Sequence, residues 1–129
     1  MRILLDTHVL LWALISPAKL KKKVRTIIEQ PENQIIFSAA SIWEIAIKNQ
    51  LGKSDFTILP EDVLEAALET EFTELPISAN AASFVYRLPF HHRDPFDRLL
   101  IAQAVSEPAR FFTADRTLQP YSELVTLIA

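Results

Sequence analysis

The 129-residue chain contains no cysteine and only one glycine, Gly52. Without cysteine there is no disulfide, no zinc–thiolate site and no thiol nucleophile, a composition that fits a reducing compartment. A single glycine excludes the glycine-rich phosphate loops of dinucleotide-binding and P-loop proteins. It also excludes the G-x-S-x-G elbow of serine hydrolases. Any chemistry must therefore come from other residue types.

Long hydrophobic runs are missing as well. Asp6 interrupts the first apolar run after four residues, so this run does not predict a signal peptide, and no later run approaches the length of a membrane span. We therefore expect a soluble, cytoplasmic protein without membrane contact. Half of the residues are apolar, which at this length predicts one domain over residues 1–129. The net charge of −3 argues against a generally basic nucleic-acid binder but leaves a local basic patch open.

Short apolar segments alternate with helical patterns along the whole chain. Strands are expected over residues 2–5, 34–38, 72–77, 110–113 and 124–128. The acids and Pro76 of the third indicate an edge strand or a short element. Helices are expected over residues 8–15, 18–30, 39–51, 78–88 and 94–106, with another beginning at Pro60. Gly52 suits the left-handed position that closes a helix, and residues 53–59 form a connection with room for a short extended piece. The alternation predicts an α/β fold with three layers and a central, mostly parallel sheet.

The segment from His91 to Ala104 begins with ionisable residues and becomes helix-core sequence. Asp94 suits the N-cap and Pro95 the first helical position, while Asp97 falls at the third, from which its side chain can reach back to the cap. A second interpretation is that both carboxylates face a divalent cation. Acids elsewhere in the chain decide between the two.

Further acids are predicted at the same edge of the sheet. Asp6 follows the first strand and Asp115 the fourth, and the carboxyl ends of parallel strands share one edge with the starts of the following helices. Glu44 lies among apolar neighbours in the helix after the second strand, where burial without compensation is costly. An alternative pairs Glu44 with Ser41 in an S-x-x-E capping box.

Converging carboxylates repel one another unless a cation compensates them. Mg²⁺ or Mn²⁺ prefers oxygen ligands, and acid-lined metal sites serve phosphodiester hydrolysis. Nearby cationic side chains could hold substrate phosphates, although each taken singly also fits a surface or salt-bridge role. These are His8, His91, His92, Arg93, Arg98 and Arg116. Adjacent histidines point in different directions on most backbones, which argues against a joint metal site for His91 and His92.

A cluster of basic residues between positions 19 and 25 has two interpretations. It forms either a solvated helix face or a contact with RNA phosphates, and the solvated face is the commoner role. The cluster comprises Lys19, Lys21, Lys22, Lys23 and Arg25.

Four segments together resemble the PIN-domain family, in particular the VapC-type toxin ribonucleases of toxin–antitoxin pairs. They are Leu4-Leu5-Asp6-Thr7-His8, Ser41-Ile42-Trp43-Glu44-Ile45, the run from Asp94 to Ala104, and Phe112-Thr113-Ala114-Asp115. The first and last segments are weak signals singly. The order and spacing of all four segments together make the resemblance specific. The resemblance extends from Ile3 to the C-terminus and implies a PIN-like three-layer fold.

The resemblance implies a Mg²⁺- or Mn²⁺-dependent ribonuclease that hydrolyses RNA. The implied catalytic and metal-binding acids are Asp6, Glu44, Asp97 and Asp115. Asp6 and Asp97 would be the most direct ligands, and Thr7 would support the site through its hydroxyl group. Asp94 is an additional acid that many members lack, and it fits either a ligand or a helix cap. The family also implies a homodimer and a cognate VapB-like antitoxin whose C-terminal segment obstructs the pocket.

Three other classes fit the chain less well. A receiver-like signalling domain needs an acidic pair after the first strand, where this chain has Asp6-Thr7. A haloacid-dehalogenase-type phosphatase needs an aspartate two residues after its nucleophile, and His8 occupies that position. A catalytically inactive PIN-like binding module would not need all four acids, which are present here.

Overall fold

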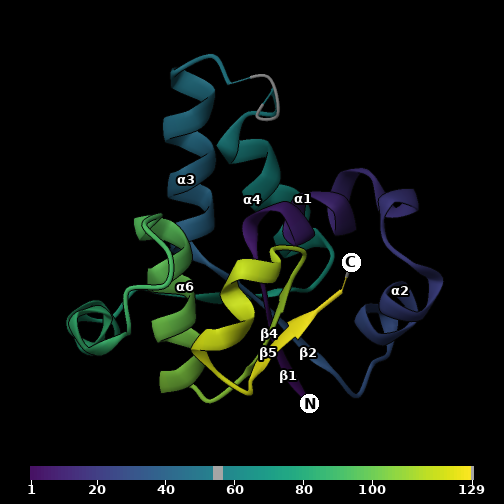
Figure 1. Ribbon diagram of the computed structural model, residues 1–129. Coiled ribbons are helices and arrows are strands. Elements are labelled where there is room, and N and C mark those ends of the chain that lie inside the picture. Colours follow the sequence, from purple (N-terminus) through teal and green to yellow (C-terminus); the bar gives the residue numbers. More distant parts are fainter. Residues whose placement is uncertain (54–56, 129) are drawn as a thin grey trace.

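A five-stranded sheet with the order β3-β2-β1-β4-β5 forms the centre of the molecule (Figure 1). The structure is a computed structural model and describes residues 1–53 and 57–128. All four neighbouring strand pairs are parallel. The strands are β1 (Arg2–Leu5), β2 (Gln34–Ser38), β3 (Thr73–Leu75), β4 (Arg110–Thr113) and β5 (Val125–Leu127). The predicted α/β fold with a parallel sheet is confirmed, and β3 lies at the expected edge.

Helices cover both faces of this sheet, and Figure 1 shows α6 on one side and α1 and α2 on the other. The α-helices are α1 (Thr7–Ile15), α2 (Lys22–Glu29), α3 (Ala39–Gln50), α4 (Pro60–Glu69), α5 (Ala79–Phe84) and α6 (Pro95–Ser106). The described residues also form three 3₁₀ helices: η1 (Pro17–Lys19), η2 (Val85–Arg87) and, between β4 and β5, η3 (Arg116–Tyr121). Within the described residues, each helix is too short or too polar to span a bilayer.

The strands β1, β2 and β4 are apolar without alternation because each contributes to two cores. In β1, Ile3 and Leu5 pack into one cluster together with Val24 of α2. Leu4 points to the opposite cluster, which also contains Leu100 of α6. Successive side chains of a strand point to opposite faces, so a strand between two helical layers is apolar at every position. This pattern produces the three layers.

Two predicted helices are each divided in the structure. The helix expected over 18–30 is η1 followed by α2, because Leu20 and Lys21 adopt extended backbone that buries Leu20 in the core. The helix expected over 78–88 is α5 followed by η2 and ends before Pro89, since a residue preceding proline disfavours helical backbone. Of the connection at 53–59, residues 54–56 lie outside the described residues.

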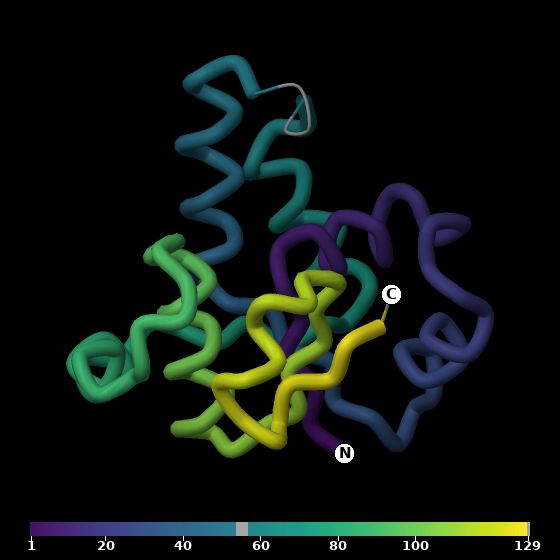
Figure 2. Tube along the Cα trace, in the orientation of Figure 1, coloured from purple at the N-terminus to yellow at the C-terminus, as the bar shows by residue number. Residues whose placement is uncertain are grey.

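The order of the strands creates a crevice between β1 and β4. From β1 the chain proceeds outward to β2 and β3, and it then returns to the other side of β1 for β4 and β5. Figure 2 follows this path from purple at the N-terminus to yellow at the C-terminus. At such a reversal the connections leave the sheet in opposite directions, which opens a crevice at the carboxyl ends of the strands. Asp6 directly follows β1, and Asp115 lies two residues after the end of β4.

The helices α3 and α4 end in the same type of hydrogen-bonded turn, but a different residue occupies the left-handed position in each. After α3, Gly52 has φ 73° and donates to the carbonyl of Asn49 at 3.0 Å, as predicted for this glycine. After α4, Glu71 has φ 68° and donates to the carbonyl of Leu68 at 3.0 Å. Left-handed backbone suits glycine and strains a residue with a Cβ atom.

These two positions predict opposite changes in stability. Gly52→Ala should lower the free energy of unfolding by about 1 kcal/mol, because a Cβ at this φ is strained. Among the described residues, apart from the chain neighbours of Gly52, no atom lies within 4 Å of the new Cβ, so these residues add no crowding. Glu71→Gly should raise the free energy of unfolding by about 0.5 kcal/mol. Urea denaturation measures the free energy of unfolding of both variants. Changes of the same sign in the two variants would contradict the left-handed backbone assigned to Gly52 and Glu71.

Candidate metal centre

Asp6 is fixed at the end of β1 by donors on both of its carboxylate oxygens. Its backbone N–H donates to the carbonyl of Phe112 in β4 at 2.9 Å, which places Asp6 at the crevice. Oδ1 accepts from the N–H of Thr7 at 2.7 Å, and Oδ2 accepts from the hydroxyl of Thr113 at 2.6 Å. Each carboxylate oxygen has two acceptor sites, so one on each oxygen is left for a further ligand.

Glu44 is almost fully buried in α3, at 3% exposure. Its Oε1 accepts from the hydroxyl of Thr7 at 2.7 Å, and its Oε2 pairs with Nζ of Lys48 at 2.5 Å. The alternative capping box with Ser41 is wrong, because Ser38 is the N-cap of α3 and Ser41 lies within the helix. The Ser41 hydroxyl instead lies 2.9 Å from that of Thr7. Lys48 and Thr7 thus supply the compensation that burial of Glu44 requires.

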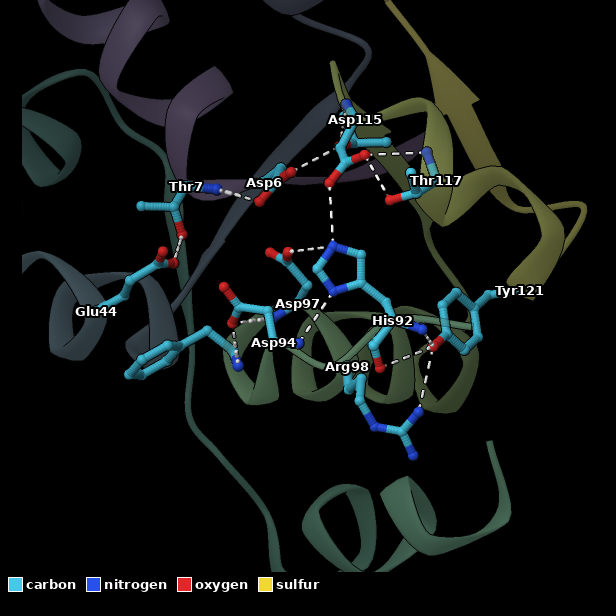
Figure 3. A network of polar contacts seen from close by, with 12 residues as sticks. Asp6, Thr7, Glu44, His92, Asp94, Asp97, Arg98, Asp115, Thr117 and Tyr121 are labelled. Atoms are coloured by element: carbon cyan, nitrogen blue, oxygen red, sulfur yellow. Dashed lines mark hydrogen bonds and ion pairs between the residues drawn. The ribbon is translucent and has the colours of Figure 1, made fainter. Parts of the chain in front are cut away.

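Asp94 caps α6, as predicted, but Asp97 does not complete the cap. Oδ1 of Asp94 accepts from the N–H of Phe96 at 2.8 Å and from that of Asp97 at 3.4 Å. The N–H of Asp94, to which Asp97 was expected to reach back, donates to Nδ1 of His92 at 3.0 Å. The expected role of Asp97 in the cap is therefore wrong. A ring from outside the helix takes that hydrogen bond, and the Asp97 carboxylate faces the crevice (Figure 3).

Asp115 follows β4 and is held by the turn that begins η3. Its Oδ1 accepts from the N–H of Thr117 at 2.9 Å and from the Thr117 hydroxyl at 2.6 Å. Its own N–H donates to Oγ1 of Thr113 at 3.0 Å, and that hydroxyl donates to Asp6. Thr113 therefore links the acids that follow β1 and β4.

The structure brings the five predicted acids into one pocket of about 300 Å³. Figure 3 shows their carboxylates converging from β1, α3, α6 and the end of β4. The described residues that line the pocket are Asp6, His8, Trp12, Glu44, Lys48, Asp94, Asp97, Ala114 and Asp115. Five carboxylates thus share this space with Lys48, whose ammonium group pairs with Glu44.

The proximity of the acids changes their proton affinities. Burial, followed by repulsion from Asp6 and Asp94, raises the pKa of Asp97 to about 8. Burial also raises the pKa of Asp6, although hydrogen bonds from Thr113 and Thr7 oppose the change. Burial pushes the pKa of Asp115 upward too, but hydrogen bonds from Thr117 outweigh it and the net pKa is lowered. The pocket therefore holds a full set of carboxylate charges at neutral pH only with an added cation.

The predicted phosphate-holding residues occupy different environments. Nε2 of His92 lies 3.3 Å from Asp115 and 3.6 Å from Asp97, whereas the ring of His91 packs against Tyr121 with centroids 5.0 Å apart. The two histidines therefore point apart, as expected. Arg93 and Arg116 are exposed, and His8 lines the pocket.

Arg98 is instead buried, and its guanidinium group binds backbone carbonyls. It is only 7% exposed and donates to the carbonyls of Pro89 at 3.0 Å and Val85 at 3.1 Å. Its guanidinium also lies 4.7 Å from the centre of the Phe90 ring. This cation holds the segment before α6 in place, and its position does not expose it to a phosphate.

The lysines between positions 19 and 23 are exposed around η1 and the start of α2. Among the described residues, those that line the acidic pocket come from other elements. The choice between a solvated face and an RNA contact therefore stays a prediction, and any such contact lies outside the pocket.

Sequence reasoning gave no site role to four residues that hold the site together: Lys48, Thr113, Thr117 and Tyr121. Lys48 stands four residues after Glu44, and this helical spacing is a signal for an ion pair. Thr113 is the last residue of β4 and stands two residues before Asp115, which is a weaker signal. Tyr121, whose hydroxyl accepts from the N–H of His92 at 2.7 Å, left no local signal because the two residues are far apart in sequence.

The donor set of the pocket fits a hard dication. The acids that line it offer only oxygen atoms, which Mg²⁺ and Mn²⁺ prefer. Burial and then repulsion among the carboxylates raise the pKa of Asp97, and a bound cation would offset that repulsion. Glu44 is paired with Lys48, and both Thr117 donors occupy Oδ1 of Asp115. Each oxygen of Asp6 keeps one acceptor site, and the Asp97 carboxylate faces the crevice, so Asp6 and Asp97 have the most room for a further ligand.

The model of the PIN domain family matches residues 3–124, and the chain belongs to this family. The match covers β1 through η3 and includes all five acids of the pocket.

Solved structures share the fold at low sequence identity. One is a chain of VapBC2 from Rickettsia felis, solved bound to a promoter DNA fragment: TM-score 0.71, 16% identity, with 98% of this chain and 97% of that chain covered. Another is VapC20 from Mycobacterium tuberculosis, described as a Sarcin-Ricin loop cleaving toxin: TM-score 0.61, 13% identity, with 92% of this chain and 93% of that chain covered. A comparison with curated proteins gives no match.

The raised pKa of Asp97 predicts how stability depends on pH in the absence of metal ions. Between about pH 4 and pH 8 the folded protein holds a proton on Asp97 that the unfolded chain releases, so rising pH costs stability. The Asp97→Asn variant has no titrating carboxyl group at this position, so it does not lose this stability as the pH rises. In chelator, the variant should exceed the wild type by on the order of 1–3 kcal/mol at pH 8.5 and by much less at pH 5. Urea denaturation at both pH values measures the difference, and a gap independent of pH would contradict the assignment.

Proposed function

We propose that this protein is a metal-dependent endoribonuclease and the toxin component of a VapBC-like type II toxin–antitoxin system. The observation that carries the proposal is the convergence of Asp6, Asp97 and three further acids in one pocket at the β1–β4 crevice. Membership of the PIN domain family and structural likeness to VapC-type toxins support the choice of RNA as the substrate class. We propose Mg²⁺ or Mn²⁺ as the cofactor.

We assign different tasks to the acids of the pocket. Asp6 and Asp97 hold the cation directly, and Glu44 and Asp115 hold a second cation or a water molecule. When bound, the cation lowers the pKa of the attacking water and stabilises the leaving oxygen of the phosphodiester. Thr7 supports the site through its hydroxyl, which keeps Glu44 oriented.

Other residues keep the acids in position before substrate arrives. Thr113 donates to Asp6, Thr117 donates to Asp115, and Lys48 neutralises Glu44. Fixed donors of this kind reduce the rearrangement that metal binding requires. Asp94 caps α6 and lines the pocket, so we assign it the helix cap and an electrostatic contribution.

We propose that exposed cations beside the pocket hold RNA phosphates. Arg116 follows Asp115 directly, and His91 and Arg93 precede α6. Positive side chains around an acidic centre offset its repulsion of the RNA backbone. Arg98 is left out of this surface because its guanidinium is buried among carbonyls.

The proposed partners follow from the toxin assignment. We propose a VapB-like antitoxin that obstructs the acidic pocket and a homodimer of this chain, acting in the cytoplasm. The structure of VapBC2 from Rickettsia felis, solved bound to a DNA fragment from their promoter, supports an antitoxin partner.

Removing either direct ligand should abolish activity. Asp6→Asn and Asp97→Asn each delete a charge at the centre of the pocket with little change in size, so Mg²⁺-dependent RNA cleavage should fall at least about 100-fold. Growth arrest on expression should be relieved in both variants. Cleavage of a labelled RNA pool by purified protein, with and without chelator, measures the effect.

Two further variants control this experiment. Asp62→Asn changes an exposed acid of α4 outside the pocket and should leave cleavage unchanged. Asp94→Asn should be milder than either ligand variant, because asparagine caps a helix nearly as well as aspartate. A wild-type protein that binds Mg²⁺ but leaves RNA intact would favour an inactive PIN-like binding module, and full activity of Asp97→Asn would refute the site.

A further inference from the structure

His92 lies between two acids of the pocket and is held from three directions. Its Nε2 is 3.3 Å from Oδ2 of Asp115 and 3.6 Å from Oδ2 of Asp97 (Figure 3). On the other side of the ring, Nδ1 accepts the N–H of Asp94 at 3.0 Å. The backbone N–H of His92 donates to the hydroxyl of Tyr121 at 2.7 Å.

The contact with Asp94 determines where the imidazole proton resides. A backbone N–H can only donate, so Nδ1 of His92 must offer a lone pair. In the neutral ring the proton is then on Nε2, and this N–H is directed toward the carboxylates of Asp97 and Asp115. The ring of His92 therefore presents a fixed Nε2–H group at the edge of the pocket, 3.3 Å from Asp115 and 3.6 Å from Asp97.

This tautomer argues against direct metal binding by His92. The group His92, Asp97 and Asp115 has the spacing of a three-ligand site, with candidate ligand atoms within 4.8 Å of one another. Metal binding through Nε2 would move the proton to Nδ1, where it would face the N–H of Asp94. The Nδ1–H of His92 and the N–H of Asp94 would then face each other without an acceptor. The N–H of Asp94 would lose its hydrogen-bond partner.

The ring is also anchored to the body of the protein. The Tyr121 hydroxyl that accepts from His92 also accepts from Nη1 of Arg98 at 3.2 Å. Arg98 in turn holds the carbonyls of Pro89 and Val85 in the segment before α6. The buried arginine, which has no place in the proposed RNA surface, thus fixes the backbone that carries His92.

We propose that His92 is a positioning residue of the metal centre: its Nε2–H orients the carboxylates of Asp97 and Asp115 for a dication, and it is not itself a ligand. The inference rests on the proposed function, because it assumes that these acids bind a metal ion. Donors behind metal ligands typically contribute about 10- to 100-fold to metal affinity. His92 carries out this task for two ligands at once and also completes the helix cap.

Two substitutions separate the functions of the two ring nitrogens. His92→Gln can place an amide N–H near the position of Nε2, whereas His92→Asn can accept from Asp94 but does not reach the carboxylates. Binding of Mn²⁺ alone, measured without RNA by electron paramagnetic resonance of the free ion, gives the affinity. We expect His92→Asn to weaken binding about 10- to 100-fold and His92→Gln to stay within about threefold of the wild type.

A spectroscopic measurement distinguishes a donor from a ligand. Electron spin-echo envelope modulation of the bound Mn²⁺ should show no directly coordinated imidazole nitrogen in the wild type. A ¹⁴N coupling that disappears in His92→Gln would make His92 a ligand and overturn the proposal. Wild-type affinity in His92→Asn, or equal losses in both variants, would overturn it as well.

Tyr121→Phe extends the test to a variant that keeps the imidazole. It removes the hydroxyl that anchors the His92 backbone, and a weaker affinity for Mn²⁺ with unchanged coordination is expected. If Tyr121→Phe binds Mn²⁺ with wild-type affinity, the proposed anchoring of His92 by Tyr121 would be wrong. A wild-type protein that binds no Mn²⁺ would refute the proposed function itself. An affinity that His92 variants do not change would refute only the role of His92.

Discussion

Repulsion among carboxylates at the β1–β4 crevice is the constraint around which this structure is arranged. Asp97 has a pKa of about 8 because it is buried and surrounded by other acids. Such a cluster costs folding free energy, which proteins accept at sites where a ligand later relieves it. The remaining polar residues around the pocket are consistent with this view, since each donates to or neutralises one acid. Thr113 donates to Asp6, and Thr117 donates to Asp115. Thr7 donates to Glu44, and Lys48 neutralises it.

The start of α6 shows how the fold keeps one carboxylate available. A helix with aspartate at both the cap and the third position normally uses both for its own N–H groups. Here Asp94 serves as the cap, and His92 accepts the N–H that Asp97 would otherwise take. Local stability of the helix and availability of Asp97 are therefore compatible. The same arrangement places His92 beside Asp115, so one ring connects the helix start with the end of β4.

The sequence predicted the convergence of the acids because that convergence follows from topology. Asp6 and Asp115 follow parallel strands, and the carboxyl ends of such strands meet at one edge, so their proximity needs no knowledge of side-chain packing. The partners of these acids were harder to predict. Tyr121 and His92 meet through a contact between residues 29 positions apart, which no local pattern encodes. The capping roles expected for Asp97 and for Ser41 with Glu44 failed because local propensity gave way to contacts from other elements. The division of the helix at Leu20 has the same origin, since burial of one leucine outweighs helix continuity.

The most direct test of the central claim is the anomalous difference map of a crystal soaked in Mn²⁺. The account predicts a peak in the acidic pocket within coordination distance of carboxylate oxygens of Asp6 and Asp97, with Nε2 of His92 directed to Asp97 and Asp115 and not to the ion. A map without a peak in this pocket, at Mn²⁺ concentrations that support RNA cleavage, would contradict the assignment of the acids to a metal centre.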